Sequence, residues 1–177
     1  METIILAEKR NEMFLINVTN MHWLEGVDET EDLCLHGHVC VQIGNELLEY
    51  DTTVSATALY LLKTLTEDHR AGEGLQMLPC CGSFLVPNED LSSVEIIGCS
   101  NGIDFTVLHE GNAVTLITES GNTVHVAVED YRKTVLAFAR TISDFYGASR
   151  RKTLPPDEFE RNGYIALMNE WNRRVKC

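Results

Sequence analysis

Residues 34–40, which read CLHGHVC, alternate thiol and imidazole side chains with small or apolar ones. Alternate side chains of a β-strand lie on one face, so this segment is predicted to present its cysteines and histidines together. His36 and His38 can then bind one zinc ion if a neighbouring strand supplies a third ligand, for which His109 and His125 are the candidates. The alternative is structural: the histidines hydrogen-bond neighbouring strands or meet solvent, and the cysteines pack as small apolar side chains.

The other cysteines give a weaker metal signal. A zinc site made of Cys34, Cys80, Cys81 and Cys99 would lack the C-x-x-C spacing that is typical of structural zinc sites. The N-terminus has no basic region of the kind that begins a signal peptide, and the apolar runs are too short to span a membrane. We therefore expect a cytoplasmic protein whose six cysteines are reduced.

Signatures of catalysis are missing from the sequence. It contains neither a G-x-S-x-G motif nor a glycine-rich loop suited to phosphate. Cys81 follows a proline turn and His69 is near it in sequence, but no basic neighbour or helix N-terminus is predicted to activate the thiol. We predict no catalytic residues and no resident cofactor, with zinc as the alternative. The chain is expected not to be an enzyme.

The densest charge cluster lies in residues 25–32, where five of eight side chains are carboxylates. Such a loop can bind a basic protein, because its charges steer the encounter while an adjacent aromatic side chain anchors the contact. The alternative is a solvated loop that favours solubility. The residues predicted to bind a partner are Trp23, Glu25, Asp28, Glu29, Glu31 and Asp32.

Charge is distributed unevenly along the chain, whose net charge is −13. Residues 1–149 hold 23 acidic and 7 basic side chains, whereas residues 150–177 hold 4 and 7. A field of this sign repels nucleic acid and attracts basic proteins, so neither nucleic acid nor a membrane is an expected partner. We predict an acidic α+β domain over 1–149 and a basic C-terminal helical appendage, 150–177, packed on it. Its basic side chains are expected to cap helix ends and pair with the acidic body.

The hydrophobic pattern predicts an α+β fold: an antiparallel β-sheet, largely a meander, with one inserted helix and two C-terminal helices. Apolar residues recur at helical spacing in 52–66 and 130–146, and Pro155-Pro156 is expected to open the last helix. Turn-forming Gly-Asn and Asn-Gly pairs separate most of the remaining runs. The expected strands lie at 4–8, 13–19, 33–43, 46–50, 83–86, 94–99, 104–110, 113–119 and 123–129.

Four segments carry a resemblance: TVSATALYLL (53–62), LPCCG (78–82), GCSNGID (98–104) and NEWNRR (169–174). Together they resemble small, acidic, mostly uncharacterised bacterial proteins, some of which accompany polymorphic toxin systems as immunity proteins. The resemblance implies a cytosolic protein that binds and neutralises one toxin, and it assigns no functional residue.

Three hypotheses follow from the sequence. The first is a non-enzymatic immunity protein that occludes the active surface of a basic toxin. The second is a zinc-binding enzyme or zinc-stabilised module that uses His36 and His38. The third is a scaffold subunit of a larger complex.

Overall fold

The computed structural model describes residues 13–176, and its first sheet is built from the N-terminal strands. Strands β1 (Phe14–His22), β2 (His36–Ile43) and β3 (Glu46–Thr53) pair antiparallel in the order β1-β2-β3. Residues of β2 alternate between a buried face, which includes Val39 and Val41, and a partly exposed face. The strand predicted at residues 4–8 lies outside the described residues.

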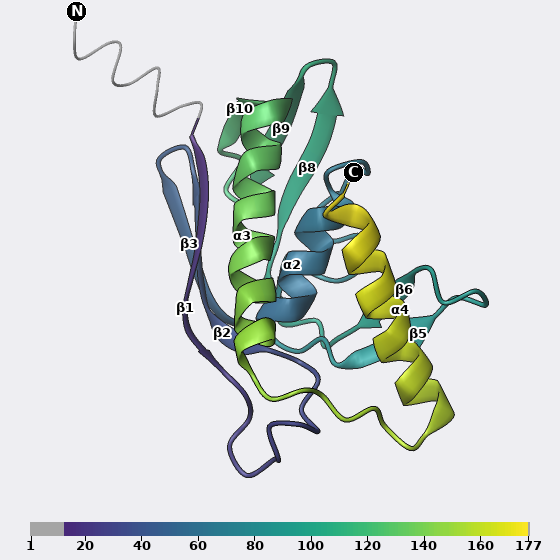
Figure 1. The fold of residues 1–177 in the computed structure, drawn as a ribbon. Coiled ribbons are helices and arrows are strands. Elements are labelled where there is room, and N and C mark those ends of the chain that lie inside the picture. Colours follow the sequence, from purple (N-terminus) through teal and green to yellow (C-terminus); the bar gives the residue numbers. More distant parts are fainter. Residues whose placement is uncertain (1–12, 177) are drawn as a thin grey trace, which may run out of the picture.

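Helix α2 (Val54–Lys63) begins directly after β3 and is buried on nearly all sides. It lies between the two C-terminal helices, α3 (Val128–Ala148) and α4 (Glu158–Arg174), and contacts both (Figure 1). A short helix that is apolar all round belongs in the interior, where every face finds a neighbour. The inserted helix is thus the central element of the core.

The remaining strands form three small sheets. Strands β8 (Phe105–Glu110), β9 (Ala113–Thr118) and β10 (Thr123–Ala127) make an antiparallel meander in the order β10-β9-β8. Strand β4 (Leu78–Pro79) pairs with β7 (Gly102–Ile103), and β5 (Phe84–Pro87) pairs with β6 (Val94–Ile97). The strands expected between 83 and 129 therefore form, but as separate small sheets.

The C-terminal helices pack on this framework with different faces. One stripe of α3 is buried against α2 and β1, while α4 crosses β5 and β6 and also contacts α2. Gly163 permits the close crossing, because a Cβ there would lie 2.6 Å from the Leu85 carbonyl oxygen. Asp157 caps α4 by accepting a hydrogen bond from the Glu160 N–H at 3.0 Å.

The buried carboxylate of Asp104 organises the segment that joins α2 to β4. It accepts hydrogen bonds from the N–H groups of Gly72 (2.9 Å) and Met77 (3.1 Å), and His69 Nε2 lies 2.7 Å from its Oδ1. Burial opposes the charge of Asp104, but the hydrogen bonds from His69 and the backbone outweigh it and lower the pKa of the carboxyl group.

A second buried carboxylate, Glu170, joins α4 to β6 and α2. It accepts hydrogen bonds from the Val94 N–H at 2.9 Å and from Arg174 Nε at 2.8 Å, and Lys63 Nζ lies 3.5 Å away. Arg174 also pairs with Glu67, which follows α2 in the chain. The basic C-terminal end is therefore paired with acidic side chains, as the sequence predicted.

The predicted α+β class is confirmed, and residues 13–176 contain one helix inserted among the strands and two at the C-terminal end. The expected boundary at 149/150 falls between α3 and α4, and the division into body and appendage stays a prediction. Among the described helices, none combines the length and the hydrophobicity needed to cross a membrane.

Candidate functional site

Trp23, the predicted aromatic anchor, is half-buried and makes its contacts within the chain. Its ring packs edge-on against Tyr146, with the ring centroids 5.0 Å apart, and Lys152 Nζ lies 3.0 Å from the centre of the Trp23 ring. The indole Nε1 donates a hydrogen bond to Ser149 Oγ at 3.2 Å. Trp23 therefore anchors the acidic loop to the segment after α3.

Two carboxylates of the loop act as local caps. Asp32 is buried and accepts hydrogen bonds from the N–H groups of Leu24 (2.8 Å) and Cys34 (3.1 Å). Asp28 accepts from both the N–H and the hydroxyl group of Thr30, and these two bonds lower the pKa of Asp28. The loop conformation is thus fixed by its own acidic side chains.

The basic segment 150–153 is hydrogen-bonded to the same loop. The Arg150 N–H donates to Glu29 Oε1 at 2.7 Å, and Lys152 Nζ donates to the carbonyl oxygen of Glu29 at 2.5 Å. The Thr153 N–H reaches the carbonyl oxygen of Thr30 at 2.8 Å. The Arg150 guanidinium also lies 3.5 Å from Asp28 Oδ1, which is an ion pair of the kind expected between the basic and acidic segments.

Of the six residues predicted to bind a partner, Glu25 and Glu31 are the exposed pair whose carboxylates have no partner among the described residues. The other four hold the loop in place. Direct contact of this loop with another protein stays a prediction.

A pocket of about 480 Å³ lies beside the loop, and we call it the acidic pocket. Glu31 and Asp32 from the loop and Glu160 from α4 line it, whereas no lysine or arginine does. The start of β2, the start of α2 and the segment 81–85 complete its walls. A volume of this size lies within the range of about 300–1,000 Å³ that is common for ligand pockets.

Exposed apolar side chains surround the acidic pocket. Four of its lining residues are large hydrophobics with exposed fractions between 43% and 55%: Leu24, Val27, Phe84 and Phe159. The rings of Phe84 and Phe159 lie 5.5 Å apart, and Ile97 pairs with Phe84 across β5 and β6 and is also exposed. We call these five residues the apolar rim. Exposed apolar side chains gathered in this way mark interaction sites.

Two buried polar atoms in the acidic pocket lack hydrogen-bond partners. They are His36 Nε2 and Thr53 Oγ1, both among the lining residues. Thr53 is the N-cap residue of α2, yet its hydroxyl group makes no capping bond. Burial, and secondarily His22, lowers the pKa of His36 despite nearby Asp32, so the ring is neutral near pH 7. Buried polar groups are rarely left unpaired, so these two atoms are exceptions in the wall of the pocket.

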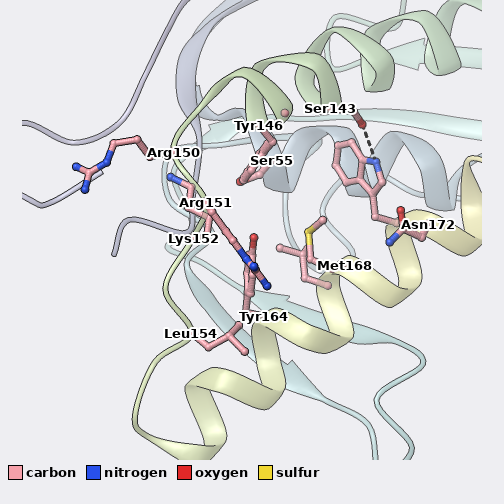
Figure 2. A pocket seen from close by; sticks show the side chains of 13 residues that line it. Ser55, Ser143, Tyr146, Arg150, Arg151, Lys152, Leu154, Tyr164, Met168 and Asn172 are labelled. Atoms are coloured by element: carbon pink, nitrogen blue, oxygen red, sulfur yellow. Dashed lines mark hydrogen bonds between the residues drawn. The ribbon is translucent and has the colours of Figure 1, made fainter. Parts of the chain in front are cut away.

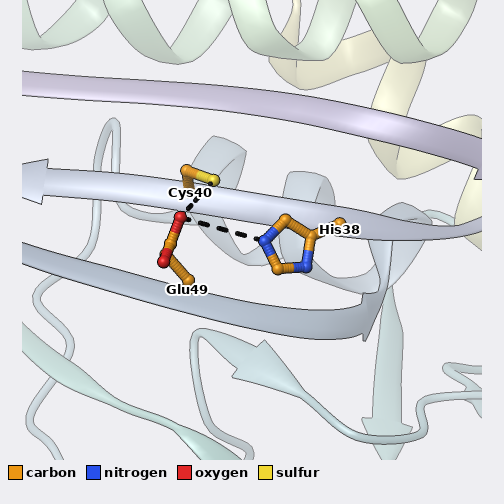
Figure 3. A group of neighbouring side chains, drawn as sticks. All are labelled: His38, Cys40 and Glu49. Carbon is orange, nitrogen blue, oxygen red and sulfur yellow. Dashed lines mark hydrogen bonds and ion pairs between the residues drawn. The ribbon is translucent and has the colours of Figure 1, made fainter.

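A separate group of possible metal ligands lies on the outer face of the first sheet. His38, Cys40 and Glu49 bring one ligand atom each to within 4.8 Å of one another (Figure 3). Asp51 Oδ1 lies 2.8 Å from His38 Nδ1, as in carboxylate–histidine pairs that orient a metal-binding imidazole. Cys40 Sγ donates to Glu49 Oε1 at 3.2 Å, and burial together with Glu49 raises the pKa of this thiol.

The histidines considered as zinc ligands lie in different parts of the structure. His36 and His38 share a face of β2, as predicted, but His36 lines the acidic pocket. His125, on β10, contacts Thr115, and His109, on β8, contacts Asp68. Neither joins the group around His38. A zinc site that uses the pair His36 and His38 stays a prediction.

The four cysteines of the weaker zinc hypothesis are also divided. Cys34 is buried behind the acidic loop, where burial raises its pKa to about 12 and makes the thiol unreactive. Cys80, Cys81 and Cys99 lie together, with the Cys99 N–H 3.0 Å from Cys81 Sγ. In the described part of the chain, no metal-binding group of three ligands includes these thiols.

The chain matches no protein-family model, and comparisons with curated proteins and with solved structures give no match either. The function is therefore inferred from the pockets themselves. Sequence reasoning identified two of the three carboxylates of the acidic pocket, but it missed Val27, Phe84 and Phe159. The apolar character of all three is visible in the sequence, whereas the exposure of Phe84 and Phe159 depends on how β5 meets α4.

Proposed function

We propose that this chain is a non-enzymatic binding protein that docks a basic protein on the acidic pocket and the apolar rim. The proposal rests on two features that lie together. Exposed large hydrophobic side chains surround a pocket whose lining includes carboxylates but no lysine or arginine. Apolar contact area with charged groups beside it is the anatomy of a protein-binding surface.

A lysine or arginine side chain of the partner suits this pocket. Its aliphatic stem packs on the exposed faces of the adjoining Phe84 and Phe159 rings, while its charged end meets Glu31 and Glu160. The charge of the whole chain speeds the encounter, and the apolar rim slows dissociation.

Within this proposal the acidic loop has two roles. Glu25 and Glu31 face the partner, whereas Trp23, Asp28, Glu29 and Asp32 hold the loop in the shape that forms one wall of the pocket. The most specific form of the proposal is a cytoplasmic bacterial immunity protein that covers the active surface of a basic toxin. The resemblance in the four sequence segments and the charge of −13 support it.

The experiment begins with native mass spectrometry of the protein isolated from its own host at low salt. We expect a complex with a basic polypeptide that dissociates as salt rises. The double variant Glu31→Lys, Glu160→Lys should slow association with that polypeptide and flatten its salt dependence. Phe84→Ser should mainly speed dissociation. The matched control, Glu73→Lys with Glu119→Lys, changes the net charge equally at exposed sites away from the pocket. Equal kinetics for both double variants, or no complex at all, would reject the proposal.

A second candidate function is zinc binding, which the group of His38, Cys40 and Glu49 favours. Its three ligands leave a fourth position for water or substrate, as in an open zinc site. Dialysis against zinc followed by metal analysis should give one equivalent, lost in His38→Ala and Cys40→Ser but kept in His125→Ala. If His36→Ala also loses zinc, the result would instead support a zinc site that uses the pair His36 and His38. Absence of stoichiometric zinc would end this candidate.

A further inference from the structure

A second pocket, of about 510 Å³, lies between α3, α4 and the segment that joins them (Figure 2). Its walls come from the C-terminal end of α3, the segment 150–154, the face of α4 between Tyr164 and Asn172, and Ser55 at the start of α2. We call it the basic pocket. None of its lining residues belongs to the acidic pocket.

The charge of the basic pocket is opposite to that of the chain. Arg150, Arg151 and Lys152 line it, and no aspartate or glutamate does, although the chain holds 27 acidic residues. Arg150 and Lys152 are engaged by the acidic loop. Arg151 forms no hydrogen bond or ion pair with the described residues, and its side chain extends toward Tyr164 (Figure 2). One cation is therefore available to a ligand.

The inner wall of the basic pocket is aromatic. Trp171 and Tyr164 are buried side chains that face it, with Met168 between them. The ring of Trp171 is held in place because its Nε1 donates to Ser143 Oγ at 3.1 Å. A flat apolar wall fixed in this way suits stacking with a planar ligand.

Tyr164 adds an unused polar group to this wall. Its hydroxyl makes no hydrogen bond with the described residues, although the side chain is 8% exposed. Burial, and secondarily the nearby thiol of Cys34, raises the pKa of Tyr164, so the hydroxyl stays protonated near pH 7. It can therefore donate a hydrogen bond into the pocket.

We infer that the basic pocket binds a small planar organic anion, an aromatic carboxylate, with its ring against Trp171 and its charge on Arg151. A guanidinium group matches a carboxylate through two parallel hydrogen bonds, which a single ammonium group cannot form. The Tyr164 hydroxyl supplies a further donor to the same carboxylate. Apolar walls with a few convergent polar groups are the usual composition of small-molecule sites.

The test uses the full chain and two probes of the same shape, 2-naphthoate and its uncharged counterpart 2-naphthamide. Calorimetric titration should show saturable binding of one naphthoate, accompanied by a change in tryptophan fluorescence. Arg151→Ala should weaken naphthoate about tenfold, the size expected for one charge-assisted contact, and leave naphthamide nearly unchanged. Tyr164→Phe should weaken naphthoate severalfold while keeping the fold.

The matched control is Arg140→Ala, which removes the same charge from an exposed position on α3 outside the pocket. Equal naphthoate affinity for Arg151→Ala, Arg140→Ala and the unchanged chain would overturn the inference, as would the absence of saturable binding. The result is independent of the proposed function, because no variant here touches the acidic pocket.

Discussion

At the scale of single residues, the buried carboxylate of Asp104 predicts how the stability of the folded chain depends on pH. Its pKa in the folded chain lies below the ordinary value of 3.8, because His69 and backbone N–H groups stabilise the charge. A lowered folded-state pKa contributes stability that is present above 3.8 and is lost as pH falls through the folded-state value. The stability of the native chain should therefore fall with acidification below about pH 4.

The corresponding variant is Asp104→Asn. It should lower the free energy of unfolding at pH 7 by about 2 kcal/mol, because several hydrogen bonds lose a charged acceptor. Urea unfolding at a series of pH values from 7 to 3 should also show that Asp104→Asn loses less stability on acidification than the unchanged chain does. Asp144→Asn, at an exposed position of α3, is the control. A slope as steep as that of the unchanged chain would contradict this role of Asp104.

Glu170 allows a second prediction at this scale. Its side chain is 1% exposed and is surrounded by Arg174, Lys63 and the Val94 N–H. Glu170→Gln should cost about 3 kcal/mol of unfolding free energy, because buried positive charges lose their counterion. Glu158→Gln, in the exposed first turn of the same helix, should cost far less. A loss below about 1 kcal/mol for Glu170→Gln would show that the network is not a stabilising one.

At the scale of elements, the basic segment after α3 and the acidic loop form one unit. Lys152 contributes most, since its ammonium group lies over the Trp23 ring and also donates to the Glu29 carbonyl oxygen. Lys152→Met keeps the alkyl stem and removes the charge, so it should cost about 1–2 kcal/mol. Amide hydrogen exchange of residues 24–31 should accelerate. Lys133→Met, on an exposed side of α3, is the control, and equal exchange in both variants would disprove the coupling.

The sequence predicted most elements but not their grouping into sheets. Alternation in 33–43 and helical spacing in 130–146 are local signals. Strand β2 formed within the first range, beginning three residues later, and α3 formed close to the second. Alternation indicates which face of a strand is buried, but it does not indicate which strand lies beside it. The two-residue strands β4 and β7 are too short to show any period, so their pairing was not predictable.

The candidate site was predictable only in its charged part. The five carboxylates of 25–32 are visible in the sequence, and so is Trp23. That Trp23 packs under Lys152, while Phe84 and Phe159 stay exposed, depends on contacts between segments 75 or more residues apart. Composition alone cannot distinguish an aromatic residue that holds a loop from one that meets a partner.

At the scale of the whole molecule, the charge of −13 predicts how stability responds to salt. Excess like charge destabilises a compact state, and salt screens charges at the surface more than the buried pairs around Glu170. Raising sodium chloride from 10 mM to 300 mM should therefore increase the free energy of unfolding by roughly 1 kcal/mol, the scale of surface ion interactions. Urea titrations at the two concentrations measure this change. A decrease with salt would mean that surface ion pairs outweigh the repulsion.

Helix α4 is a wall of both pockets, since Phe159 and Glu160 face the acidic one while Tyr164, Met168 and Trp171 face the basic one. The helix is a rigid rod, and Gly163 seats it against β5 between these two groups. An occupant that tilts one end of the rod changes the shape offered to the occupant of the other. Thermodynamic reciprocity then applies: whatever factor a small anion imposes on the affinity for a basic protein, that protein imposes on the affinity for the anion. Because α4 lines both pockets, a small anion and a basic protein would influence each other's binding if either of them shifts this helix.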